Sequence, residues 1–120
     1  MNVKVRVALS FKRQAKPLLK KYPSLIKELS QLESDLKENP KMGTPLGNNT
    51  FKIRLASKSK NKGKSGGLRV ISHLETEIIG FAEYNGENIT VILISIYDKA
   101  EYDTSDTSLL LKILKEEGIR

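Results

Sequence analysis

The chain of 120 residues contains no cysteine and a single histidine, His73. Without cysteine it can form neither disulfides nor thiolate metal sites, and a zinc site usually needs three or four protein ligands. We therefore expect neither a metal nor a cofactor.

Long apolar runs are also lacking, since no segment approaches the roughly 18 residues that cross a bilayer as a helix. From Val3 the N-terminal residues alternate between apolar and charged, unlike the continuous apolar segment of a signal peptide. These features predict a cytoplasmic protein that does not enter membranes. The length predicts one domain, residues 1–120, with a modest core.

Acidic residues are fewer than basic ones. The chain has 14 Asp and Glu against 21 Lys and Arg, which gives a net charge of +7. A field of this sign attracts polyanions and speeds their encounter with the protein. Nucleic acid, an acidic protein and an anionic membrane are the candidate partners.

Hydrophobic spacing predicts an α+β fold in the order strand, two helices, three strands, helix. Alternation in residues 3–9, 51–55 and 68–74 indicates half-buried strands. Residues 89–97 are apolar on both faces, as in a strand inside a sheet, and Asn85-Gly86 before them is a strong hairpin signal. We expect an antiparallel-rich twisted sheet with a helical hairpin packed on one face.

The helices are expected to follow Ser10 and Ser24, each a plausible N-cap. Pro17 predicts that the first helix is kinked or begins late. Residues 41–50 are rich in Gly, Pro and Asn and are expected to form a loop. Asp106 is expected to open a last helix.

The charges of the predicted strands gather on the face turned away from the helices. A single strand often carries such charges only because its outer face is solvated. Carboxylates, however, are nearly absent from this face before Glu75, and like charges crowded on one sheet repel each other. This favours an anionic ligand. The residues concerned are Lys4, Arg6, Lys52, Arg54, Arg69 and His73.

Two short segments beside this face could carry chemistry. Adjacent glycines in residues 64–67, followed by Arg69, would let the backbone approach a phosphate closely, although a plain turn between strands explains them equally well. The second segment, at the end of the last strand, gathers Tyr97, Asp98, Lys99 and Tyr102, where functional groups often collect.

The segments 51–55, 63–71 and 96–99, together with the order of elements, resemble the RelE/HigB branch of the RelE/ParE toxin superfamily. The resemblance implies a RelE-like β-α-α-β-β-β-α fold. It also implies a type II toxin that cleaves mRNA on the ribosome, needs no metal, inhibits translation and is silenced by a cognate antitoxin protein.

The resemblance assigns roles to individual residues. The arginine after the glycine pair is a catalytic or phosphate-contacting residue of the family, and basic residues on the preceding strand, on the loop and after the last strand assist it. A terminal tyrosine or histidine of the family has Tyr97 and Tyr102 as its candidates. The catalytic candidates are thus Arg69, Lys64, Lys52, Lys99 and Tyr97, and the RNA-binding candidates are Arg54, Lys58, Lys60, Lys62, Tyr102 and His73.

Two other functions stay open at this stage. The same fold could belong to a ParE-like toxin that acts on DNA gyrase without RNA chemistry. A non-catalytic RNA- or ribosome-binding module would keep the basic face and cut nothing. Codon preference, oligomeric state and the residue that serves as general base are not indicated by the sequence.

Overall fold

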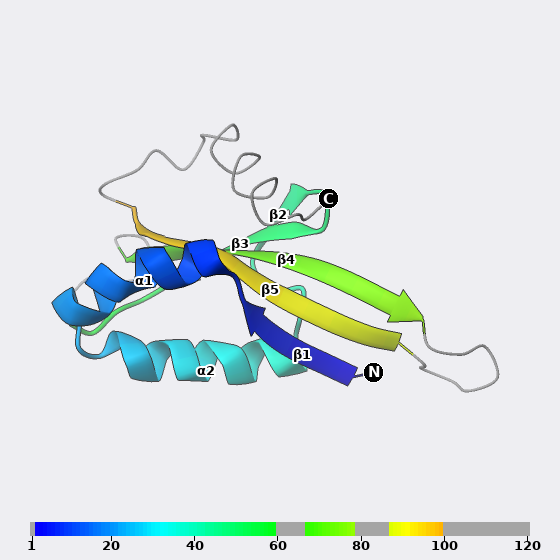
Figure 1. Ribbon diagram of the computed structural model, residues 1–120, viewed down its shortest axis with the longest axis horizontal. Helices are drawn as coiled ribbons and strands as arrows, with labels where there is room; N and C mark the ends of the chain where they lie inside the picture. Colours follow the sequence, from blue (N-terminus) through cyan, green and yellow to red (C-terminus); the bar gives the residue numbers. More distant parts are fainter. Residues whose placement is uncertain (1, 60–66, 79–86, 100–120) are drawn as a thin grey trace.

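The computed structural model describes residues 2–59, 67–78 and 87–99 (Figure 1). They form an α+β fold, which confirms the predicted class, with two helices and a five-stranded mixed sheet in the order β1-β5-β4-β3-β2. The elements are β1 (Asn2–Val7), α1 (Leu9–Lys21), α2 (Leu25–Glu38), β2 (Thr44–Gly47), β3 (Thr50–Leu55), β4 (Leu68–Ile78) and β5 (Glu87–Asp98).

Strand pairing is antiparallel except between β1 and β5, which are parallel. β5 lies between β1 and β4, so the prediction of an interior strand is confirmed. β4 and β5 form a long antiparallel pair that begins at Ile78 and Glu87. The predicted turn at Asn85-Gly86 and the helix expected from Asp106 lie outside the described residues.

Both helices bury apolar residues at i, i+4, i+7 and i+11, the spacing of one helix face. Leu29 is partly buried and the others are buried against the sheet, where each large side chain contributes about 1.5–3 kcal/mol. None of the described helices is long and apolar enough to cross a membrane. The apolar residues on the buried helix faces are Phe11, Ala15, Leu18 and Tyr22 for α1 and its end, and Leu25, Leu29, Leu32 and Leu36 for α2.

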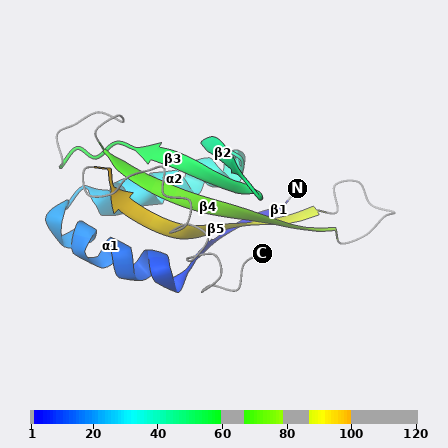
Figure 2. The ribbon, with the colours of Figure 1, turned by 90° about the horizontal axis from the view of Figure 1, so that it is seen from above.

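α1 lies along the part of β5 that β1 does not reach (Figure 2). The helix begins at Leu9 with Ala8 as N-cap, so the prediction that Ser10 caps it was wrong, as was a late start caused by Pro17. The Ser10 hydroxyl donates instead to the carbonyl of Ile94. The Gln14 carbonyl oxygen accepts from the backbone N–H of Ile96 at 3.0 Å. The helix thereby satisfies the open edge of β5.

α2 follows Ser24 as predicted, but the Ser24 side chain makes no capping hydrogen bond. Its backbone is already helical, with φ −73° and ψ −12°, whereas a capping residue is normally extended. The hydroxyl donates instead to Glu28 Oε2 at 3.2 Å and accepts from the backbone N–H of Ser59 at 3.0 Å. These bonds fasten the start of α2 to the chain that leaves β3.

The loop predicted for residues 41–50 is wrong in part, because β2 pairs there with β3. Asn48 and Asn49 both have φ 57°, so they form the two-residue turn that matches the twist of a β-hairpin. Asparagine tolerates this backbone conformation better than most residues. The observed element order therefore contains one strand more than the predicted order.

Candidate nucleic-acid interface

The register of β3, β4 and β5 places the predicted site residues in transverse rows on the face opposite the helices. Arg54 lies directly across from Arg69, and Arg69 directly across from Tyr97. Neighbouring strands are about 4.8 Å apart, so the three side chains are immediate neighbours. We call these residues the arginine row. Arg54 and Arg69 thus share one face, as the sequence predicts.

Lys52 belongs to the next row on the same face, opposite Ile71. Two residues along a strand correspond to about 7 Å, so its amine can reach the space above the arginine row. Lys52 is half-buried, and Arg54 is exposed. Arg54 is therefore the cation of the row that an incoming anion meets first.

Arg69 is buried, with only 2% of its surface exposed. Its Nη1 donates to the backbone carbonyl of Leu68 at 3.2 Å. Burial lowers the pKa of Arg69, the positive charge of Arg54 lowers it further, and Tyr97 acts in the opposite direction. The guanidinium thus lies in a poorly solvated position beside a second cation.

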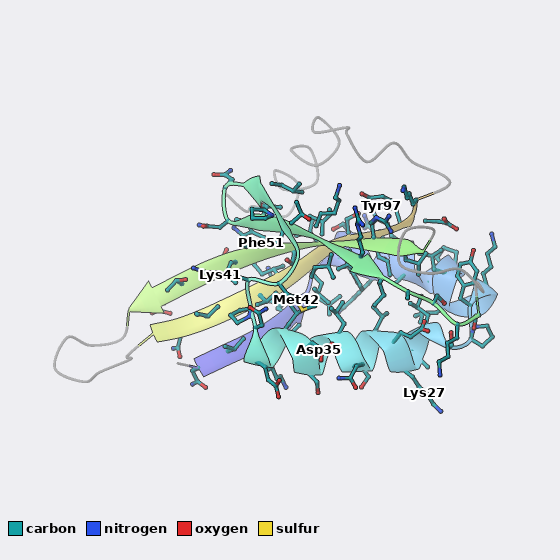
Figure 3. The ribbon with its side chains drawn as sticks, turned by 180° about the vertical axis from the view of Figure 1, so that it is seen from behind. Lys27, Asp35, Lys41, Met42, Phe51 and Tyr97 are labelled. Atoms are coloured by element: carbon teal, nitrogen blue, oxygen red, sulfur yellow. The ribbon has the colours of Figure 1, made fainter. Side chains whose placement is uncertain are left out.

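Tyr97 closes the row on β5 and is half-buried. Figure 3 shows it on the side of the sheet opposite α2, whereas Met42 lies between the sheet and that helix. Burial raises the pKa of Tyr97, and the positive charge of Arg69 lowers it in part. Its phenol is therefore protonated at neutral pH and can donate a hydrogen bond or a proton.

The end of β5 separates residues that are neighbours in the sequence. Asp98 is buried on the helix side, where its Oδ2 accepts from the hydroxyl of Tyr22 at 3.1 Å. Lys99 is exposed, and its backbone N–H lies 3.4 Å from the carbonyl oxygen of Gly67, just before β4. Tyr97 and Lys99 are therefore kept in the candidate site, and Asp98, on the helix side of the sheet, is not part of it.

Lys4 and Arg6 share the outer face but lie away from the arginine row. Arg6 on β1 is in the row of His73, and Lys4 is in the row of Glu75. Four residues separate His73 from Arg69 along β4, about 13 Å. The predicted cationic face thus has two parts, and only the part around the arginine row gathers several of the catalytic candidates.

His73 lies away from the arginine row, in the row of Arg6, and it differs from Arg69 in charge. Its side chain is buried, with 3% exposed, and its Nδ1 lies 3.2 Å from the Thr50 hydroxyl. Burial lowers the pKa of His73, and Glu75 raises it in part. A buried neutral imidazole offers no charge to a phosphate, so we leave His73 out of the proposed site.

The lysine-rich loop is described only where it leaves β3. Glu28 Oε2 accepts from the backbone N–H of Lys58 at 2.8 Å, and Ser57 beside it is buried. Lys58 itself is exposed. The loop therefore starts from a fixed point near α2. Lys60, Lys62, Lys64 and Tyr102 lie outside the described residues.

The outer face also has an apolar cluster that sequence reasoning missed. It consists of Ala8, Ile71, Ile92 and Ile94, with Tyr97 packed against it. The apolar pattern of residues 89–97 on both faces was the available signal. Within the described ranges, no group of three or more His, Cys, Asp or Glu side chains could hold a metal ion.

Comparisons of the chain with models of known protein families, with curated proteins and with solved structures gave no match in any of the three. The placement of the side chains described above is therefore the main guide to function.

Proposed function

We propose that the protein is a metal-independent endoribonuclease, a type II toxin of the RelE/HigB kind with a RelE-like topology, which cleaves mRNA on the ribosome and inhibits translation. The observation that carries the proposal is the arginine row, with Lys52 beside it on the same face. A toxin of this kind would act in the cytoplasm on translating ribosomes. Its partner would be a cognate antitoxin that covers the basic face or a sheet edge.

The electrostatics of the row favour a phosphate. Like charges directly opposite each other on two strands are destabilising, and burial adds to the cost for Arg69. A phosphate bound at exposed Arg54 would lie close to both positive charges, and their mutual repulsion would be offset by attraction to a shared anion. Arginine suits this role because its planar fork can hold two phosphate oxygens at once.

The chemistry needs three functions around one phosphate. The RNA 2′-oxygen attacks the adjacent phosphorus while a base takes its proton, and the bond from phosphorus to the 5′-oxygen breaks. The products are a 2′,3′-cyclic phosphate and a 5′-hydroxyl. The attack also needs stabilisation of negative charge on the phosphorane and a proton for the leaving 5′-oxygen.

We assign these functions by position. Arg54, which is exposed, contacts the phosphate, and buried Arg69 beside it adds the positive charge that stabilises the phosphorane. Tyr97 supplies the proton to the 5′-oxygen, since its raised pKa keeps the phenol protonated at neutral pH. Lys52 is the candidate for the base among the residues that the structure describes. Lys99, which follows β5, assists with its positive charge. The ribosome would contribute by holding the mRNA in a geometry ready for attack.

The test compares three proteins in a translating extract, with primer extension to locate cuts in the mRNA. Wild type should cut. Arg54→Gln should cut about 10²–10³ times more slowly, as expected when one charge-stabilising group is lost. Lys37→Gln removes the same charge from an exposed position on α2 and should cut like wild type.

Arg69→Ala should also be inactive, and its urea unfolding curve shows whether the variant folds. Equal cutting by wild type and Arg54→Gln would contradict the assignment of the row. Inhibition of gyrase supercoiling by a protein that cuts no mRNA would instead identify a ParE-like toxin. Ribosome binding without any cutting would identify a non-catalytic module.

A further inference from the structure

The strongest feature outside the proposed site is the charge on α1. The helix contains five cations and no acidic residue, and all five side chains are exposed. At 3.6 residues per turn, four of them fall within about 100° of the helix circumference. Lys21 points elsewhere and lies over the ring of Tyr22, 5.5 Å from its centroid. The four, which we call the α1 cationic stripe, are Lys12, Arg13, Lys16 and Lys20.

Helix chemistry alone does not explain the stripe. The positive end of the helix dipole lies at the N-terminus, so cations are favoured in the last turn and disfavoured in the first. Lys20 is in the favoured turn, but Lys12 and Arg13 lie near the start, where α1 has no acidic residue. The other helix, α2, mixes Lys27 and Lys37 with four acidic residues. Lys12 and Arg13 are therefore placed against the preference of the helix dipole.

The stripe is carried by a rigid element. Gln14 and Ser10 bond to the β5 backbone, and Phe11, Ala15 and Leu18 pack into the core. From Lys12 to Lys20 the helix rises about 12 Å. A fixed row of cations of this length matches a ligand whose anionic groups are themselves held in a fixed row.

We propose that the α1 cationic stripe is a second RNA-binding surface, which docks on the phosphate backbone of double-helical RNA. The identity of the polyanion rests on the proposed function, because a nuclease that works on the ribosome must lie against structured RNA. The arginine row binds the single-stranded mRNA, and the α1 cationic stripe binds a neighbouring RNA duplex. Duplex RNA is recognised mainly through its shape and backbone, which suits a surface of cations without aromatic groups.

An anionic membrane fits the helix less well. Amphipathic helices bind bilayers by inserting an apolar face below their charged face. In α1 the apolar residues Phe11, Ala15 and Leu18 are already buried in the protein core. Leu9 is the one large apolar side chain of α1 that is strongly exposed. The surface thus offers charge but little apolar area.

The test measures binding of the full chain to a fluorescent RNA duplex of about 16 base pairs, the length spanned by known duplex-binding domains, by anisotropy at several salt concentrations. The variant Lys12→Gln/Arg13→Gln/Lys16→Gln should lose at least tenfold in affinity. Its slope of log affinity against log salt should fall by about two to three units, at about 0.9 per phosphate contact.

The matched control is Lys27→Gln/Lys37→Gln/Lys41→Gln, which removes the same charge from exposed positions on and after α2. It should retain wild-type affinity to within about threefold. Lys12→Arg/Lys16→Arg keeps the charge and should bind like wild type, which shows that charge rather than a disturbed fold is measured. Equal losses in both triple variants, or no loss in either, would overturn the proposal.

Two further arms separate the alternatives. Vesicles of phosphatidylglycerol and phosphatidylcholine that bind through α1 while the duplex does not would overturn the proposal in favour of a membrane. Arg54→Gln should slow mRNA cleavage about 10²–10³-fold and leave duplex affinity unchanged. If wild type cuts nothing but binds the duplex through α1, the proposed nuclease function fails and the docking surface stands.

Discussion

Tyr97 is the residue whose surroundings most clearly define its chemical role. It is half-buried beside the apolar cluster of the outer face and directly opposite Arg69. Burial favours its neutral form more than Arg69 favours the phenolate, so the pKa of Tyr97 is raised. A phenol in this state is a poor base and a usable proton donor at neutral pH.

Tyr97→Phe should therefore slow cleavage by about 10²–10⁴, the range for loss of general acid catalysis, with little effect on mRNA binding. The measurement is the single-turnover rate on purified ribosomes. An mRNA with sulfur in place of the leaving 5′-oxygen needs no proton donor and should restore the rate of the variant. Failure of this substrate to restore it would assign Tyr97 to positioning rather than to proton transfer.

His73 predicts how stability depends on pH. Burial lowers the pKa of His73 from the usual 6.5. Below pH 6.5 the histidine therefore binds a proton in the unfolded chain, while it stays neutral in the folded protein until the pH falls to the lowered pKa. The stabilising contribution is complete above pH 6.5 and is lost as the pH falls towards the lowered pKa. The urea midpoint should accordingly drop between pH 7.5 and pH 5.5.

The variant His73→Asn supplies the control, since an amide can keep a hydrogen bond to Thr50 without titrating. Its urea midpoint should change less over this interval than that of wild type. The same pH dependence in both proteins would show that other groups cause it.

For individual residues, the sequence predicted the side of the sheet on which a side chain lies better than it predicted whether that side chain is buried. Alternation along β4 correctly assigned Arg69 and His73 to the outer face, because successive side chains of a strand point to opposite sides. Their burial depends on which segments cover that face. Such contacts join parts of the chain far apart in sequence, and local patterns carry no record of them.

At the scale of elements, the hairpin of β2 and β3 supports the strand that carries Lys52 and Arg54. Gly43, just before β2, has φ +103°, and a Cβ there would lie 2.6 Å from the carbonyl oxygen of Lys52. Gly47 has φ +91°, but a Cβ would meet nothing within 4 Å. Both positions disfavour other residues, and only Gly43 is also closed by the backbone of β3.

Gly47→Ala should cost about 1–3 kcal/mol of stability from backbone strain alone. Gly43→Ala should cost clearly more, because the backbone of β3 must also move, and it should slow mRNA cleavage by displacing Lys52. Urea unfolding of the two variants checks the order. An equal loss of stability in both would show that contact with β3 is not the cause.

The same hairpin shows where element prediction failed. Residues 41–50 contain the glycines, proline and asparagines of a loop, yet four of them form β2, which pairs with β3. The pair Asn48-Asn49 was the available signal, since asparagine is among the residues that accept the positive φ of a hairpin turn. The helices were easier to predict, because their apolar spacing extends over three turns.

At the scale of the whole molecule, two cationic surfaces among the described residues are the ones that we assign to RNA. One is the arginine row with Lys52, and the other is the α1 cationic stripe. The composition predicted a polyanionic partner, and the alternation of the strands located the first surface. The second was not predicted, because its significance depends on α1 lying along the edge of β5.

Binding of single-stranded RNA should weaken steeply with salt. With about five phosphate contacts, each contributing about 0.7 to the slope of log affinity against log salt, affinity should fall roughly 100-fold between 50 and 200 mM. A DNA strand of the same sequence should bind with a similar slope and stay uncut, since it lacks the attacking hydroxyl. An affinity independent of salt would contradict recognition through phosphates.

The most direct measurement of the central claim is the chemistry of the ends that wild-type protein leaves on mRNA in a translating extract. Attack by the 2′-oxygen at the arginine row predicts 5′-hydroxyl ends, which a polynucleotide kinase labels without prior phosphatase treatment, facing 2′,3′-cyclic phosphates. Arg54→Gln should produce such ends about 10²–10³ times more slowly. Fragments with 5′-phosphates, or 5′-hydroxyl ends produced equally by Arg54→Gln, would contradict the account.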